Sequence, residues 1–287
     1  MSPREELERI RDFQARVDEG AASERREWRF GIAVLSPEIP RVWDANYMRI
    51  DDAEAASAAG ADAVGAEASD LAAGASLAHV AIVANEGTAS LLQPGLEALG
   101  FATTRLEVMV LTRPPDPPDV PVGEASFDDV AASRRETTLE FSPGNEELAD
   151  QLRVLDRRLE ASVGGRWFAV REGGRIVSRA WLLGDGRIGQ VEDVATTPSA
   201  RGRGLGRAVV SAAALASHRA GTELTFIVAD ADETVARMYE KLGFERLGVY
   251  ERFVRPMEPP SSHSSPRSAS PSGPREPRTR TPHPRRS

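Results

Sequence analysis

The stretch from Thr196 to Val210, TTPSARGRGLGRAVV, holds the residues whose types and spacing best suit ligand chemistry in this chain. Glycines stand at alternate positions among three arginines, and small and apolar residues follow. Because glycine has no Cβ, a ligand can approach the backbone closely there. A helix predicted to begin at Leu205 adds free N–H groups and a partial positive charge at its first turn. This combination favours an anion, and in particular a diphosphate.

Three phosphate-binding templates compete for this loop. A P-loop ends in Gly-Lys-Ser or Gly-Lys-Thr, whereas here Gly206 is followed by Arg207 and Ala208. A Rossmann turn needs a third glycine, and that position holds Arg207 or Val209 in the two registers. These mismatches disfavour a P-loop and a nucleotide-binding oxidoreductase. The third template is the pyrophosphate loop of coenzyme A enzymes, and a surface loop without a ligand is the structural alternative.

The loop RGRGLG, residues 201–206, is similar to the Q/R-x-x-G-x-G/A motif of the GNAT (Gcn5-related) N-acetyltransferases. Two neighbouring segments strengthen the resemblance. VATTP precedes the loop at the end of a predicted strand. ARMYEKLGFERLGV, residues 236–249, looks like the tyrosine helix of the family with the L-G-F that follows it. The resemblance covers residues 122–255.

This resemblance implies a fold class and a reaction. The fold would be α/β (α+β), with a GNAT-like mixed, mostly antiparallel sheet flanked by helices, in two units. The reaction would move an acetyl group from acetyl-CoA, bound as co-substrate, to an amine acceptor by direct attack. Because the chain has no cysteine, a thiol acyl-enzyme is excluded. A catalytically inactive protein that binds or senses CoA is the alternative.

The same resemblance assigns residues to acetyl-CoA. The acyl-pantetheine arm would pair with the backbone of Val194, Ala195 and Thr196, and the N–H of Val194 would polarise the thioester carbonyl. Asp232 stands where the family often has an asparagine that helps to hold the pantetheine arm or a water, and it is a further cofactor-binding candidate. The pyrophosphate would lie on the loop residues Arg201, Gly202, Arg203, Gly204, Leu205, Gly206 and Arg207.

Tyr239 and Glu192 are the predicted catalytic residues. Tyr239 matches the tyrosine that in the family protonates the leaving thiolate, and its alternative role is a core aromatic on an amphipathic helix. In the predicted strand, alternation gives Glu192 the same face as Val194 and turns Asp193 the other way. A carboxylate near the thioester could deprotonate an ammonium directly or through water. The alternative for Glu192 is a charge on an edge strand.

Composition narrows the function classes. The 287 residues carry a net charge of −8, which argues against generic nucleic-acid binding and suits a cationic amine acceptor, either a small molecule or a peptide. Disulfides and thiolate metal sites are excluded without cysteine, and the four histidines lack ligand spacing, so no metal is expected. No apolar run reaches the ~18 residues of a membrane span, and the N-terminal residues lack a signal peptide. We expect a cytoplasmic protein with no membrane or nucleic-acid partner, and a homodimer is left open.

Two composition changes divide the chain. Prolines and alternating charge predict a stiff linker at residues 112–121. It separates a degenerate GNAT-like domain at 1–111 from an acetyltransferase domain at 122–256. Residues 257–287 are rich in Pro, Ser and Arg, lack hydrophobic periodicity and are predicted to be disordered. A dispensable solvated tail and an electrostatic tether are its two interpretations.

The elements that must position the loop are clearest in the C-terminal part. RWFAVRE and RIVSRAWLL, joined by Gly173-Gly174, predict a hairpin, and IGQVEDVAT, residues 188–196, predicts a third strand. Apolar spacing from Leu205 onwards predicts the helix after the loop. ELTFIVA, a short helix through Tyr239 and GVYERFVR complete the order of strand, helix and strand.

The N-terminal part echoes this order weakly. Residues 30–36 and 78–84 are predicted strands, and GTASLLQPGLEALGF is a predicted helix with a break at Pro94. LEALGF and TRLEVMVL resemble the end of a second GNAT unit that has lost its glycine loop, so one acetyl-CoA per chain is expected. A purely structural domain is the alternative. A further helix is predicted over residues 5–17, with an apolar stripe formed by Leu7, Ile10, Phe13 and Val17.

Overall fold

One mixed sheet of eleven strands runs through the part of the chain that the computed structural model describes, residues 1–230 and 233–257. Its strand order is β1-β2-β3-β4-β11-β5-β10-β9-β8-β7-β6. The strands are β1 (Glu24–Trp28), β2 (Gly31–Leu35), β3 (Tyr47–Ile50), β4 (His79–Asn85), β5 (Ala102–Leu111), β6 (Gly123–Ala125), β7 (Gly165–Glu172), β8 (Arg175–Gly184), β9 (Ile188–Thr196), β10 (Leu224–Asp230) and β11 (Phe244–Pro256).

Helices cover both faces of this sheet. Apolar clusters place α2, α3, α6 and α7 on one face, and α1, α4 and α5 on the other. Their bounds are α1 (Pro3–Ala21), α2 (Ala53–Gly74), α3 (Glu86–Ala98), α4 (Phe127–Phe141), α5 (Glu146–Val163), α6 (Leu205–Arg219) and α7 (Glu233–Lys241), with short 3₁₀ turns η1 (Trp43–Ala45) and η2 (Pro198–Ala200). The predicted fold class is confirmed. None of the helices in the described ranges is long and apolar enough to cross a bilayer, and the predicted cytoplasmic location stays a prediction.

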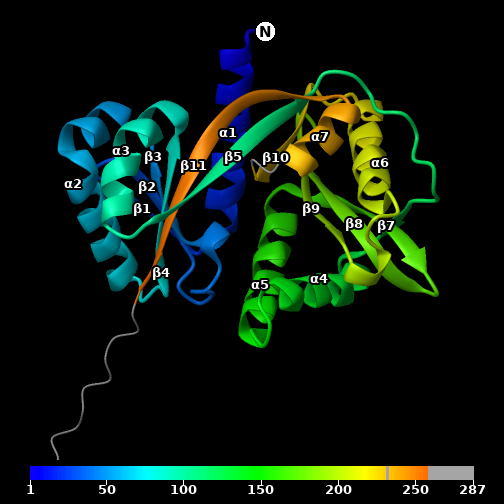
Figure 1. The fold of residues 1–287 in the computed structure, drawn as a ribbon, viewed down its shortest axis with the longest axis horizontal. Coiled ribbons are helices and arrows are strands. Elements are labelled where there is room, and N and C mark those ends of the chain that lie inside the picture. The colour runs from blue at the N-terminus through cyan, green and yellow to red at the C-terminus, as the bar shows by residue number, and fades with distance from the viewer. Residues whose placement is uncertain (231–232, 258–287) are drawn as a thin grey trace, which may run out of the picture. The chain divides into compact units, whose positions relative to one another are not determined.

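The order strand, helix, strand, helix, strand occurs twice, as β3-α2-β4-α3-β5 and as β9-α6-β10-α7-β11. In each set the first two strands are parallel neighbours. The last strand of each set pairs with the other set, because β5 lies beside β10 and β11 lies beside β4. Figure 1 shows β5 and β11 side by side as antiparallel neighbours. The two predicted parts therefore exchange strands within one sheet, and the division into two units at residues 112–121 stays a prediction.

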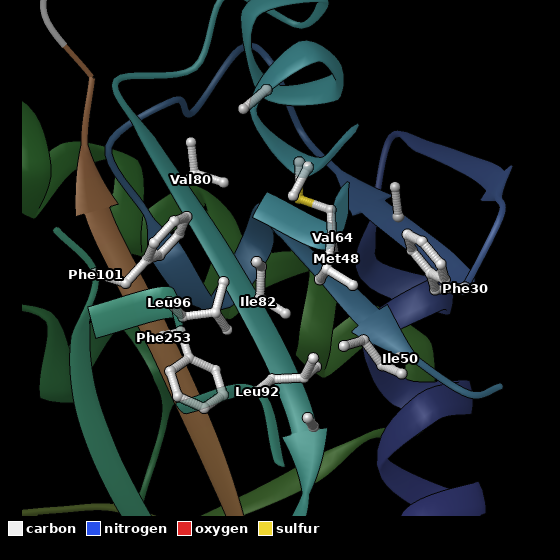
Figure 2. Close-up of a cluster of buried hydrophobic side chains, with 14 of the residues drawn as sticks. Phe30, Met48, Ile50, Val64, Val80, Ile82, Leu92, Leu96, Phe101 and Phe253 are labelled. Carbon is white, nitrogen blue, oxygen red and sulfur yellow. The ribbon is translucent and has the colours of Figure 1, made fainter. Parts of the chain in front are cut away.

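The exchanged strands also complete the hydrophobic cores. Phe253 of β11 is fully buried among residues of the N-terminal part, including Leu96 and Phe101 (Figure 2). In return, Met109 of β5 is buried with Val209 and other residues under α6. Burying a large apolar side chain contributes about 1.5–3 kcal/mol, so each exchange stabilises the half of the sheet that receives the strand.

Most elements predicted from apolar spacing are present. The N-terminal helix is longer than predicted, and Ile10, Phe13 and Val17 are buried on it. The break predicted at Pro94 is wrong, since α3 continues through this residue. Five further elements were not predicted from the sequence: β1, β3, β6, α4 and α5. Residues 258–287, predicted to form a disordered tail, lie outside the described residues.

Candidate functional site

Strands β9 and β10 separate partway along their length. They pair only from Ile188 to Val191, opposite Leu224 to Ile227. Beyond Val191, β9 stays paired with β8 on its other edge. The backbone that follows therefore presents an edge to the gap, and such an edge can pair with an extended amide-bearing chain. The predicted pantetheine contacts, Val194, Ala195 and Thr196, lie on this stretch.

The glycine loop lies between this strand and α6. Gly202 and Gly204 have φ values of +74° and +76°, in the left-handed region that suits glycine. Apart from the glycine itself and its two chain neighbours, no atom of the described residues lies within 4 Å of the position that a Cβ would take on either residue, so the approach to their backbone is open. Gly204 is the N-cap of α6 without a side-chain cap. The N–H groups at 205–207 therefore have no partner within the helix and can donate hydrogen bonds to an anion.

Each arginine of the loop already has a carboxylate partner. Arg201 lies 2.5 Å from Glu140, and Arg203 lies 2.5 Å from Glu172. A third pair joins the side chains of Arg207 and Asp119. These carboxylates were not predicted, because they are distant in sequence from the loop. Because exposed ion pairs are weak, a diphosphate can compete with them for the guanidinium groups.

Tyr239 is 5% exposed and lies on α7. Its ring packs against Phe244, with 6.1 Å between ring centroids, in the same apolar cluster as Val191. Burial raises the pKa of the Tyr239 hydroxyl above its usual value, and the Glu192 carboxylate raises it further. The phenol therefore keeps its proton at neutral pH. The two predicted catalytic residues lie close enough for the charge of one to act on the other.

Glu192 is half-buried and lines a cavity of about 820 Å³. Its carboxylate accepts hydrogen bonds from the Gln190 amide, at 2.5 Å, and from the Asp193 N–H. Burial raises the pKa of Glu192 to about 7, and the charge of Asp44 also raises it. A carboxyl group with this pKa can take a proton near neutral pH, as a general base must.

A β-bulge changes the predicted faces of β9. The pairing register between β8 and β9 changes after Glu192, so that two residues of β9, Asp193 and Val194, lie opposite the single residue Ala180 of β8. As a result Glu192 and Asp193 both line the cavity, whereas Val194 packs in the apolar cluster under α6. The prediction that Glu192 and Val194 share a face, with Asp193 opposite, is therefore wrong. Simple alternation fails where an extra residue enters a strand.

Acidic side chains dominate the cavity wall. The lining carboxylates are Glu8, Asp12, Asp18, Asp44, Asp51, Asp156, Glu192, Asp193 and Asp230, and the lining guanidinium groups are Arg11, Arg49, Arg134 and Arg252. Ion pairs join Arg49 to Glu19 and Asp51, Arg134 to Asp156 and Asp193, and Arg252 to Asp44. Of these four arginines, only Arg11 forms no ion pair with another described residue. The cavity is thus better suited to a cation than to an anion.

Two further predictions concern Asp232 and the absence of a metal ion. Asp232 lies outside the described residues, so its predicted contact stays a prediction. Within residues 1–230 and 233–257, no group of three or more His, Asp or Glu side chains is arranged to hold a metal ion.

The pKa of Glu192 leads to a pH prediction. Because this pKa is about 7, the carboxyl group is protonated and cannot act as a base at lower pH. We expect kcat/KM of any reaction that uses Glu192 as its base to fall about tenfold per pH unit below this pKa. A pH profile measured between pH 5 and 9 checks this. A value of kcat/KM that stays constant down to pH 5 would show that Glu192 is not the base.

Comparison with known proteins adds a family to this geometry. Residues 164–246 match the family described as acetyltransferase (GNAT) domain. The glucosamine 6-phosphate N-acetyltransferase of Trypanosoma brucei brucei is 33% identical over 109 residues, and the match covers 36% of this chain and 71% of that enzyme. The probable glucosamine 6-phosphate N-acetyltransferase 2 of Oryza sativa subsp. japonica is 38% identical over 73 residues, which are 25% of this chain and 43% of that relative.

Structural similarity extends further along the chain. A GCN5-related N-acetyltransferase from Kribbella flavida has a TM-score of 0.54 at 18% identity. The match covers 86% of this chain and 95% of that chain. At this identity the likeness concerns the fold, and it includes most of the exchanged sheet.

Proposed function

Because this chain belongs to the GNAT acetyltransferase family, we propose that it transfers the acetyl group of acetyl-CoA directly to a cationic amine. One observation carries this proposal. The separation of β9 from β10 leaves a free backbone edge beside the glycine loop, and Glu192 at the same separation lines a large acidic cavity. A donor slot and an acceptor cavity would therefore meet at one strand.

The donor is proposed to bind along β9 and the loop that follows. The pantetheine arm would pair with the backbone of Val194, Ala195 and Thr196, and the pyrophosphate would lie on the N–H groups of residues 202–207. The open approach to Gly202 and Gly204 supports this placement, because a side chain there would occupy the space of the phosphates. Among the described residues, neither Tyr239 nor the glycine loop lines the acidic cavity, so donor and acceptor would enter from different sides.

Transfer from a thioester needs a neutral amine, a stabilised oxyanion and a proton for the thiolate. Glu192 would take the proton from the bound ammonium, since its pKa of about 7 leaves it ionised at slightly alkaline pH. The Val194 N–H would donate to the oxygen that gains charge in the tetrahedral intermediate. Tyr239 would protonate the departing thiolate, and its raised pKa keeps the needed proton in place.

The charge of the cavity favours a polycationic amine over a phosphorylated sugar. The two relatives are named for glucosamine 6-phosphate, a sugar whose phosphate group is negatively charged. A phosphate in this cavity would meet many carboxylates, and three of the four arginines are already paired. An acceptor with a second ammonium group would instead be attracted by Asp12 and Asp230, which line the cavity and form no ion pair with another described residue.

The test is an acceptor panel with acetyl-CoA as donor and release of free CoA as readout. We expect kcat/KM for 1,4-diaminobutane to exceed that for glucosamine 6-phosphate by at least about tenfold, because like charges repel in the cavity. Faster transfer to glucosamine 6-phosphate would contradict the proposed acceptor class. Binding of acetyl-CoA without transfer to any amine of the panel would support the alternative, a CoA-binding protein without activity.

Tyr239→Phe is expected to lower kcat about 10- to 100-fold, because it removes the proton donor for the thiolate. The affinity for acetyl-CoA should change less than about threefold, since the buried ring remains in place. Steady-state kinetics and calorimetry separate the two effects, and the melting temperature serves as the control for folding. A variant with wild-type kcat over the whole pH range would leave Tyr239 a core aromatic only.

A further inference from the structure

The bulge in β9 forces a non-glycine residue into a rarely used backbone conformation. Asp193 has a φ value of +46°, in the left-handed region that aspartate tolerates better than most side chains. Such conformations persist only where the surrounding structure holds them, and they concentrate at functional sites. What holds this one is the side chain of Asp193 itself.

Arg179 of β8 is the first of two arginines that bind the Asp193 carboxylate. Its side chain is 1% exposed, and its Nε and Nη2 donate to the two carboxylate oxygens of Asp193 at 2.7 and 3.1 Å. Two further N–H groups of Arg179 are also used. They reach the hydroxyl groups of Ser133 and Thr137 on α4, both at 3.0 Å. The guanidinium is therefore fixed from two sides and offers Asp193 a rigid, bidentate partner.

Arg134 of α4 is the second arginine that binds the Asp193 carboxylate. Its Nη1 donates to Asp193, and its Nε and Nη2 donate to Asp156 of α5 at 2.5 and 2.9 Å. Asp193 thus lies between two guanidinium groups that belong to different elements. Either group would be left without part of its compensation if the carboxylate were removed, and an uncompensated buried charge is costly.

The contacts of Asp193 affect two groups that the proposed reaction uses, the Glu192 carboxylate and the Val194 N–H. The N–H of Asp193 donates to the Glu192 carboxylate, and Val194, the proposed oxyanion donor, is the next residue in the bulge. We infer that Asp193 is a positioning residue whose carboxylate, held by Arg179 and Arg134, fixes the bulge and thereby orients Glu192 and the Val194 N–H toward the thioester. This inference rests on the proposed function.

The chemistry of the position explains why aspartate suits it. Glycine would adopt the same φ without strain, but it would leave both arginines without the carboxylate. A longer glutamate would place its charge elsewhere, and a β-branched residue would be strained at this φ. Asparagine tolerates the conformation and keeps one acceptor oxygen, although it carries no charge.

Asp193→Ala tests the role by separating catalysis from binding. We expect kcat to fall about 100-fold, because small displacements of reacting groups have effects of this size. The dissociation constant of acetyl-CoA should change less than about threefold, since the pyrophosphate contacts at residues 202–207 lie outside the bulge. Asp193→Asn should recover about a tenth of the wild-type kcat, and it provides the measurement if the alanine variant does not fold.

Glu107→Gln is the matched control. It removes a buried carboxylate from an arginine, Arg246, but Glu107 lies on β5 and does not line the acidic cavity, so a general effect of losing a buried carboxylate would appear in it too. We expect its kcat to stay within about threefold of wild type. The inference is overturned if Asp193→Asn keeps full kcat, or if Glu107→Gln loses as much kcat as Asp193→Asn. Failure of the wild-type protein to bind acetyl-CoA would instead overturn the proposed function, and this role with it.

Discussion

Glu192→Gln is expected to lower kcat for amine acetylation about 1000-fold, within the range that general bases contribute. The amide has the shape of the carboxylate and can still accept the hydrogen bonds of Gln190 and of the Asp193 N–H, but it cannot take a proton. Acetyl-CoA affinity should stay within about threefold of wild type, because Glu192 lines the acceptor cavity and not the proposed donor slot. Single-turnover kinetics and calorimetry measure the two quantities.

Glu251→Gln is the control for this variant. Glu251 is another glutamate of the central sheet; it is buried, and it does not line the acidic cavity. Its kcat should stay within about threefold of wild type. A Glu192→Gln variant with nearly full kcat at pH 8 would show that another group, or the bulk solvent, takes the proton from the amine.

Gly204→Glu is expected to weaken acetyl-CoA binding about 100-fold or more. The new carboxylate would lie at the N-terminus of α6, where it fills the approach to the free N–H groups and repels the phosphates. Backbone strain adds to this effect, since the φ of Gly204 is +76°. Isothermal titration of the folded variant with acetyl-CoA and with CoA gives the loss directly.

Gly186→Glu separates strain from charge. Gly186 has a φ of +86° and open space around its Cβ position, as Gly204 has, but it lies in the turn between β8 and β9. The two variants should therefore lose similar stability, whereas only Gly204→Glu should lose acetyl-CoA affinity. Equal affinities in the two variants would remove the glycine loop from the binding site.

The parts of the fold that sequence could predict are those with regular apolar spacing. The strand at residues 188–196 and the helix from Leu205 have the predicted starts, because each begins with an apolar residue directly after a glycine-containing loop. In contrast, β1 is made of Glu24 to Trp28, whose charged side chains alternate between half-buried and exposed, so no apolar signal marks it. Pro94 also misled the prediction, because tertiary packing of Leu92 and Leu96 keeps α3 continuous.

The exchange of strands could not be predicted at all. Local spacing does identify β5 and β11, but it says nothing about which neighbours they choose. The candidate site shows the same limit. The motif identifies Gly202 and Gly204, whereas the carboxylate partners of the loop arginines and the two arginines around Asp193 are brought in from other elements. The bulge was missed because an aspartate in a strand carries no mark of a left-handed φ.

The most direct measurement is a crystal structure of the full chain with acetyl-CoA. We predict one cofactor per chain, with its thioester oxygen at about 2.9 Å from the Val194 N–H, the usual length of an N–H···O hydrogen bond. Its pyrophosphate should lie on the N–H groups of residues 202–207, and its methyl group should face Glu192. A cofactor bound at the N-terminus of α2, or a thioester that lies away from the gap between β9 and β10, would contradict the central claim.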